Sequence, residues 1–262
     1  MPPIKSRLTL VILIVGCIAI ASTQDLKKGP DSKKRRGDDG IYYFEDCAML
    51  YPTNPWACTD GSGHCMFDYE KCDGFTICDD KGDEDRSDCG WGETDANGCT
   101  KPKQIGNTGT KDLEDQILEA QNYFRCLHGV PALTWDSKLA AAARPVATAN
   151  AVGGLAHSDL PHGENIDMLQ LVSEDRQTGY GFSNRWYKEI ADYNFYNPDI
   201  YGYSGVTGHF TQVVWKETTK VGCAFANKKG SPYTMYVVVC EYDPPGNMFK
   251  EEAFKENVPS PI

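Results

Sequence analysis

The densest concentration of chemically active side chains lies near the N-terminal third of the chain. Residues 47–89 hold six cysteines, and ten carboxylates lie between the first and last of them against three basic residues. Carboxylates packed this closely repel one another unless a cation lies among them, and oxygen ligands in a flexible loop favour calcium. So short a segment also buries too little apolar surface to fold without cross-links or a metal. The sequence therefore predicts a small disulfide-rich, calcium-type module over residues 41–90.

The state of the cysteines depends on the compartment, and the start of the chain has the features of a secretory signal peptide over residues 1–21. Lys5 and Arg7 precede an apolar run, residues 8–20, that is too short for a comfortable membrane span. Of the 11 cysteines, Cys17 lies in this signal, and the remaining ten are an even number in an oxidising compartment. That pattern predicts disulfides rather than nucleophiles or zinc thiolates. We expect a secreted, extracellular protein with no transmembrane segment in the mature chain; an uncleaved membrane anchor is the alternative.

Charge is distributed unevenly along the chain. Residues 1–36 carry eight basic and two acidic side chains, whereas the whole chain has a net charge of -11. The acidic remainder excludes nucleic acid as a partner, because phosphate binding needs clustered Lys and Arg. Residues 22–40 read as a basic pro-segment or linker, where the run Lys33–Arg36 is either a proprotein convertase site or a solvated charge run. Residues 91–111 have the glycine-rich composition of a linker, which predicts loosely joined modules.

Residues 112–262 form the second module, and their hydrophobic spacing predicts both helices and strands. Asp136 is placed to cap a helix that Pro145 should kink or shorten. Two late segments, residues 221–225 and 233–239, favour β-structure. Helices on either side of an antiparallel sheet are the natural packing for this order of elements. Two further apolar stripes follow helical spacing: Leu113, Ile117, Ala120, Phe124 and Leu127, then Phe182, Trp186, Ile190 and Tyr193.

Four motifs in the second module identify a family resemblance. Gly208–Thr218 reads GHFTQVVWKET, and Val237–Met248 reads VVVCEYDPPGNM. Together with His157-Ser158 before Gly163–Ile166, and with Trp186–Ile190, these segments resemble the signatures of the CAP superfamily. That superfamily includes cysteine-rich secretory proteins, venom antigens and plant pathogenesis-related proteins. The resemblance implies an α+β fold, an α-β-α sandwich. The second motif departs from its signature at Glu241, where Asn, Gln, Arg, His or Ser is usual.

The resemblance also implies a polar cleft. It transfers four side chains to one site: His157, Glu164, Glu189 and His209. Two imidazoles can bind zinc, while two carboxylates can orient them or hold a bound water. The alternative is a metal-free polar network that holds loops together. His128 and His162 remain unassigned and are interpreted as satisfied surface or loop histidines.

Two further expectations follow from the same resemblance. Cys223 pairs with Cys240 in the family, which by elimination leaves Cys99 to pair with Cys126. An aromatic run after the fourth motif corresponds to a loop that binds sterol in some family members, and packing against the cleft rim is the alternative. Its candidate ligand-binding residues are Tyr193, Phe195, Tyr196, Tyr201 and Tyr203.

The acidic module has a resemblance of its own. Its segment 72–84, CDGFTICDDKGDE, resembles the low-density-lipoprotein receptor class A repeat. That resemblance implies the disulfides Cys47-Cys65, Cys58-Cys78 and Cys72-Cys89. It also implies a calcium cage built from Asp73, Asp83 and Glu84, with main-chain carbonyls near Glu70 and Phe75. Ile77 replaces a carboxylate ligand of the repeat, and Glu70 replaces an aromatic, so a lysine-docking role is not favoured.

A secreted, non-enzymatic binding protein fits these features best. We expect a lipid, a sterol or an extracellular protein as its partner. The alternative is a secreted endopeptidase with His157 or His209 as base and Ser158 as nucleophile. No sequence feature places these groups in hydrogen-bond contact or supplies an oxyanion hole, so binding is favoured over catalysis.

Overall fold

The structure is a computed structural model of the whole chain. It describes four short N-terminal strands and residues 72–75, 78, 82–84, 89–103, 110–171, 178–198, 207–230, 233–248 and 250–262. The chain divides into two compact units, Met1–Asp31 and Ser32–Ile262. The first unit, with the predicted signal peptide, lies outside the described residues. The four short strands form two antiparallel pairs: β1 (Lys34–Arg36) with β2 (Tyr42–Phe44), and β3 (Pro55–Ala57) with β4 (Cys65–Phe67).

A four-stranded sheet organises the C-terminal module, with strands in the order β5-β7-β8-β6. Its long strands are β6 (Gly163–Leu171), β7 (Lys220–Lys228) and β8 (Thr234–Asp243), and β8 pairs antiparallel with both neighbours. The short strand β5 (Thr134–Trp135) runs parallel to β7. The central strand β8 carries the run Val237–Cys240, which is buried throughout because helices cover both faces of the sheet.

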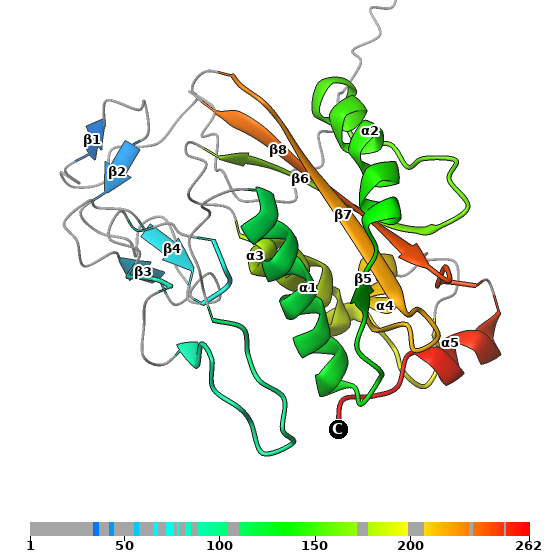
Figure 1. The fold of residues 1–262 in the computed structure, drawn as a ribbon. Helices are drawn as coiled ribbons and strands as arrows, with labels where there is room; N and C mark the ends of the chain where they lie inside the picture. The colour runs from blue at the N-terminus through cyan, green and yellow to red at the C-terminus, as the bar shows by residue number, and fades with distance from the viewer. Residues whose placement is uncertain are drawn as a thin grey trace, which may run out of the picture. The chain divides into compact units, whose positions relative to one another are not determined.

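One face of the sheet is covered by helix α2 (Ser137–Gly153), as Figure 1 shows. Asp136 caps this helix by accepting the backbone N–H groups of Lys138 and Leu139, as predicted. Small side chains allow the helix to lie close to the sheet. The buried face of α2 consists of Ala143, Ala147 and Ala151. It packs against Ile166 of β6, Ala224 of β7, and Val237 and Val239 of β8.

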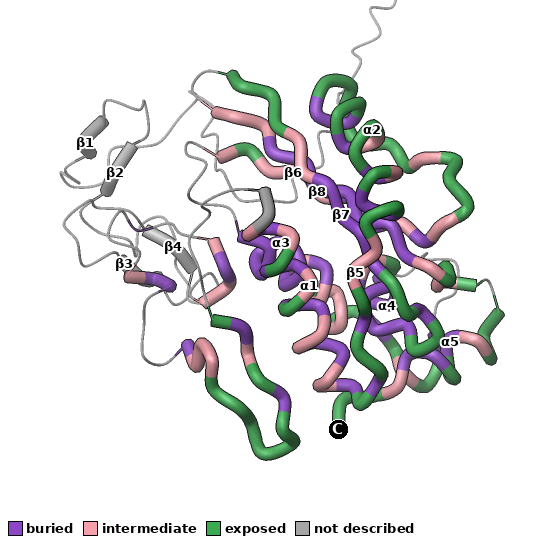
Figure 2. Tube along the Cα trace, viewed as in Figure 1, coloured by how far each residue is buried: buried purple, intermediate pink, exposed green. Residues whose placement is uncertain are grey.

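The other face carries α1 (Thr110–Leu127) and α3 (Gly179–Lys188), which pack against each other. The short η5 (Glu189–Asp192) and α4 (Gly208–Val214) complete this layer, and α5 (Glu251–Asn257) packs Phe254 edge-on against Trp215. Figure 2 shows the buried residues running along β7 and β8 and along α1 and α3. The described module is therefore the expected α-β-α sandwich. No helix among the described residues is long and apolar enough to cross a membrane.

The predicted elements agree with the structure except at Pro145 and at several elements that the sequence did not predict, among them β5 and η5. Pro145 lies inside α2, which continues to Gly153, so the expected shortening is wrong. Strand β6 and helices α4 and α5 were not predicted as elements. β6 has no regular alternation of polar and apolar residues that would predict a strand. Its polar residues Glu164 and Asn165 both hydrogen-bond to other parts of the module. Helices of seven residues, as α4 and α5 are, give too few turns for a periodic signal.

The segment around Asp73 contacts α3 through its main chain. Asn184 donates to the Asp73 carbonyl over 3.1 Å, and the Thr178 hydroxyl donates to the Gly74 carbonyl. Phe75 packs edge-on against Phe182 with ring centroids 5.7 Å apart. Glycine is required on the helix side, because a Cβ on Gly181 would lie 2.8 Å from the Phe75 ring. The loose joining expected from the glycine-rich segment is therefore wrong for these residues.

Three disulfides lie among the described residues, each with the expected partner. Cys72 is joined to Cys89, Cys99 to Cys126, and Cys223 to Cys240. The last pair links register-matched positions of β7 and β8. Cys78 is also disulfide-bonded, while Cys47 and Cys58 lie outside the described residues, so the other two expected pairings stay predictions.

Candidate functional site

The first half of the predicted cleft is a histidine–glutamate pair at the start of β6. The His157 Nδ1 lies 2.6 Å from the Glu164 Oε1, and the same carboxylate accepts the Ser158 N–H over 3.0 Å. The loop that carries His157 is fixed by Asn150, whose side-chain oxygen accepts the Ala156 N–H over 2.6 Å. The backbone before His157 is thus held against the end of α2, although the His157 side chain is 68% exposed.

The charge state of this pair is set by hydrogen bonds. Burial acts to raise the pKa of Glu164, but the bonds from His157 and Ser158 outweigh it and lower the pKa to about 2. The hydrogen bond from Glu164 in turn raises the pKa of His157. Glu164 is therefore ionised at neutral pH and accepts a hydrogen bond from His157 Nδ1, which fixes the orientation of the ring.

The second half repeats this arrangement on the opposite layer. The His209 Nδ1 lies 2.6 Å from the Glu189 Oε1, while the Glu189 Oε2 accepts the backbone N–H groups of His209 and Phe210. These N–H groups belong to the first turn of α4, where no intrahelical acceptor exists for them. The ring of Trp186 stacks on His209 with centroids 6.1 Å apart. Glu189 therefore anchors both the helix and the imidazole.

The two pairs are connected through consecutive residues of β6. Asn165, next to Glu164, donates to the His209 main-chain carbonyl over 3.1 Å. Within the part of the chain that the structure describes, no group of three or more His, Cys, Asp or Glu is gathered to hold a metal. The four predicted residues thus form two oriented pairs. In each pair Nδ1 lies 2.6 Å from a carboxylate oxygen, which leaves Nε2 as the ring nitrogen for any further contact.

The peptidase interpretation gains no contact in the structure. The Ser158 hydroxyl accepts the Leu160 N–H over 3.3 Å. No hydrogen bond between this hydroxyl and His157 or His209 occurs among the described residues. A serine nucleophile needs a base within hydrogen-bond reach, and the Ser158 side chain contacts the Glu164 carboxylate rather than either proposed histidine base.

The aromatic run divides between core and surface. Tyr193 is buried and packs against Phe210, and Phe195 packs edge-on against Tyr193. Tyr196, in contrast, is 93% exposed. Tyr201 and Tyr203 lie outside the described residues. Tyr193 and Phe195 therefore pack with the module's core. Packing against the cleft rim, the alternative considered from the sequence, stays a prediction.

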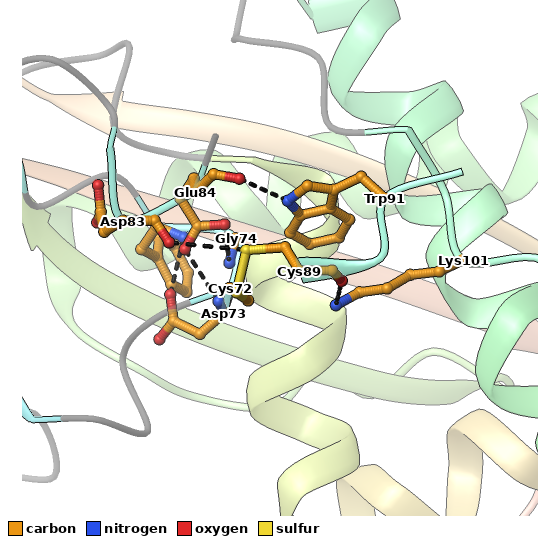
Figure 3. Close-up of a disulfide and its surroundings, with 9 residues drawn as sticks. Cys72, Asp73, Gly74, Asp83, Glu84, Cys89, Trp91 and Lys101 are labelled. Atoms are coloured by element: carbon orange, nitrogen blue, oxygen red, sulfur yellow. Dashed lines mark hydrogen bonds between the residues drawn. A yellow bond between two sulfur atoms is a disulfide. The ribbon is translucent and has the colours of Figure 1, made fainter. Parts of the chain in front are cut away.

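Three acidic residues of the N-terminal module, Asp73, Asp83 and Glu84, lie together near the Cys72-Cys89 disulfide, as Figure 3 shows. Glu84 accepts the N–H groups of Asp73 and Gly74 through its two oxygens, and the Asp83 carboxylate accepts the Cys78 N–H. Asp83 and Glu84 are buried. Burial, then the charges of Asp73 and Asp83, raise the pKa of Glu84 to about 9. Lys188 of α3 lies 3.7 Å from Asp73 and offsets part of this charge.

Two histidines and one glutamate have roles that the sequence did not reveal. His128 is buried, with Nδ1 2.6 Å from the Pro259 carbonyl and Nε2 3.1 Å from the Tyr187 hydroxyl. It is hydrogen-bonded as expected, but it lies in the core, so the expected surface position is wrong. His162 lies 3.6 Å from Glu241, which is fully buried on β8. The departure from the family signature at Glu241 was the signal that marked this position.

Comparisons with known proteins identify relatives of this chain. Residues 118–242 match the sequence profile of the CAP family, described as "Cysteine-rich secretory protein family". "Golgi-associated plant pathogenesis-related protein 1" of Homo sapiens is 38% identical over 160 residues, which cover 60% of this chain and 99% of that protein. "Secreted protein RBT4" of Candida albicans is 41% identical over 145 residues, or 54% of this chain. The chain spans 38% of the length of that Candida protein.

Solved structures are similar as well. The structure titled "Structure of BmVAL-1" aligns with 60% of this chain and 86% of its own, at 21% identity and a TM-score of 0.46. A second, titled "Crystal structure of NaASP2 with Zn2+", aligns with 60% of this chain and 90% of its own, at 24% identity and a TM-score of 0.44.

Proposed function

The chain belongs to the cysteine-rich secretory protein family, CAP, and on this premise we propose that it is a secreted, non-catalytic binding protein whose two histidine–glutamate pairs present imidazoles to a divalent metal or ligand. The observation that carries the proposal is the pair of 2.6 Å contacts from Nδ1 to carboxylate at His157 and His209. A carboxylate on one ring nitrogen fixes the tautomer and raises the basicity of the other, which is how metal-binding histidines are commonly prepared.

Zinc is the metal that this donor set favours, because neutral imidazole is a good zinc ligand. His157 and His209 would hold it through Nε2, while Glu164 and Glu189 orient the rings. When bound, zinc supplies a Lewis-acidic centre that attracts an oxygen or nitrogen atom of a ligand. Two protein ligands are fewer than the three of usual catalytic zinc sites, which supports binding rather than hydrolysis.

We expect the double variant His157→Ala/His209→Ala to lose zinc binding at pH 7.5, because both donor imidazoles are gone. Glu164→Gln and Glu189→Gln should weaken binding by about 10- to 100-fold, as second-shell changes do. Acidification should also release zinc. Because Glu164 raises the pKa of His157, protons compete at a higher pH than for an unperturbed imidazole.

Isothermal titration calorimetry on the full chain, with excess calcium to saturate the acidic module, measures these affinities. Asp159→Asn is the matched control, because Asp159 is exposed next to the site and removing its charge should change little. A double variant that binds zinc as tightly as the wild type would place the metal elsewhere. Folded variants and wild type that all fail to bind zinc would favour the metal-free polar network.

An apolar ligand is a second candidate for the same region. Leu155 and Leu160 flank His157 in sequence, and their residues are 56% and 37% exposed. Met248 is 52% exposed, and its neighbour Asn247 donates to the Gly208 carbonyl beside His209. Exposed apolar side chains close to His157 in sequence, and linked to His209 through Asn247 and Gly208, suit a lipid or a sterol better than a small ion alone. Native mass spectrometry of the secreted protein identifies any lipid or protein partner that co-purifies.

The acidic module is proposed to bind calcium as a structural element. The raised pKa of Glu84 reflects buried negative charge that a cation would neutralise. Asp73, Asp83 and Glu84 would supply the carboxylate oxygens. The resemblance to the receptor repeat remains a proposal of the same standing, and Glu70 and Ile77 lie outside the described residues.

We expect Ile77→Asp to tighten calcium binding, because it adds an oxygen ligand and a negative charge to the proposed cage. Calcium titration of the full chain by calorimetry compares the variant with wild type. Ile77→Asn serves as the control that adds an oxygen without charge and should have a smaller effect. An unchanged constant in Ile77→Asp would show that the cage does not include this position.

A further inference from the structure

Glu241 is a buried carboxyl group that contacts no Lys or Arg side chain among the described residues. It lies on β8 directly opposite Glu164 on β6, in the antiparallel register. Its residue is 0% exposed, and neither carboxyl oxygen has a hydrogen-bond donor among the described residues. The nearest cation candidate, the His162 Nδ1, lies 3.6 Å away and is itself buried without a donor or acceptor in the described part of the chain.

Two ionised carboxylates cannot satisfy each other, since both accept hydrogen bonds and neither donates. A single proton between them changes this, because the neutral acid then donates to the remaining carboxylate. The Glu164 and Glu241 side chains are in hydrogen-bond contact when one of them carries that proton. The absence of a donor for Glu241 is thereby explained without another ligand.

The environment decides which of the two carries the proton. Glu164 accepts from both His157 and Ser158, which stabilises its charge. Burial, followed by the hydrogen-bond contact with Glu164 and the charge of that carboxylate, raises the pKa of Glu241 to about 8. The other titratable groups facing the pair are His162 and Tyr242. At neutral pH the proton therefore belongs to Glu241.

We propose that Glu241 is a positioning residue of the cleft: as a neutral acid it donates a hydrogen bond to Glu164 and so holds that carboxylate where it accepts the His157 ring. The order of contacts runs from β8 through β6 to the loop after α2. Glu241 does not touch a ligand in this arrangement, but fixes the group that orients one. The proposal deepens the proposed binding site and rests on it for the role of His157.

Two substitutions at Glu241 separate the effect of its hydrogen-bond donor from the effect of its side-chain volume. Glu241→Gln keeps the shape and supplies an amide N–H to Glu164, whereas Glu241→Leu keeps much of the volume and removes the donor. We expect the glutamine variant to preserve the single His157 tautomer, seen by nitrogen NMR of the imidazole at pH 7. The leucine variant should show His157 exchanging between tautomers and about tenfold weaker zinc binding, the size of a second-shell loss.

Infrared spectroscopy tests the proton directly. The wild type at pH 7 should show a neutral carboxylic acid band that disappears in the difference spectrum against Glu241→Gln. Glu84→Gln is the control for the other carboxyl group of raised pKa, so that the two bands are assigned separately. If the glutamine variant removes no such band, Glu241 is ionised, and pairing with a protonated His162 replaces the proposal.

The outcomes distinguish this proposal from the proposed function. A wild type that binds no zinc overturns the metal site, while the NMR signature of His157 still decides whether Glu241 positions the ring. A folded leucine variant with an unchanged His157 overturns the positioning role and leaves zinc binding untouched. If the leucine variant fails to fold, the infrared difference and the glutamine variant still decide.

Discussion

Replacing Arg125 with methionine is expected to destabilise the protein by about 4 kcal/mol, because it orphans several buried carbonyls at once. Arg125 is fully buried in α1 and donates to the main-chain carbonyls of Pro131, Val213, Trp215 and Thr218. Burial lowers its pKa only to about 10, so it is charged at neutral pH. It thereby caps the C-terminal end of α4, where carbonyls lack intrahelical donors.

Urea unfolding at pH 7 measures this loss as a lower midpoint at constant slope. Arg144→Met is the matched control, since Arg144 is exposed on α2 and the same substitution there should cost less than about 0.5 kcal/mol. Equal effects at the two positions would contradict the assignment of Arg125 as the link between α1 and α4.

Gly222→Ala should destabilise the protein by about 3 kcal/mol through overpacking. Strand β7 approaches the start of α2 so closely at this point that a Cβ would lie 2.3 Å from the Ala140 nitrogen and the Asp136 carbonyl oxygen. Both contacts are backbone atoms, which cannot rotate away as a side chain could. The added methyl group would therefore have to push α2 away from β7.

The same urea experiment tests this prediction, with Gly153→Ala as its control. A Cβ on Gly153, near the end of the same helix, meets nothing within 4 Å, and alanine favours helix. Gly153→Ala should thus be neutral or slightly stabilising. A mild effect of Gly222→Ala would indicate that α2 can shift away from the sheet at low cost.

The layer order could be predicted from the sequence, whereas the close approaches could not. The apolar stripe from Leu113 to Leu127 and the β-branched run of β8 both indicate their elements, because their periods are regular. The alanines of α2 and Gly222 are small residues of no evident periodic role. Only the packing of α2 on β7 shows why they must be small.

The site divides in the same way. Motif resemblance brought His157, Glu164, Glu189 and His209 together, and the structure gives each histidine its glutamate. Register pairing across β6 and β8 was beyond the sequence, because Glu164 and Glu241 are 77 positions apart and β6 was not predicted as a strand. The contacts of Asp73 and Gly74 with Asn184 and Thr178 were missed for another reason: they use main-chain carbonyls, which every residue type carries.

The Cys99-Cys126 disulfide determines what proteolysis can separate. It joins the segment before α1 to the last turn of that helix, across 27 positions of sequence. A single cleavage anywhere between these cysteines leaves the N-terminal fragment covalently attached to the sandwich. The two fragments migrate as one species until the disulfide is reduced, so release of the acidic module in an oxidising compartment requires a cut before Cys99.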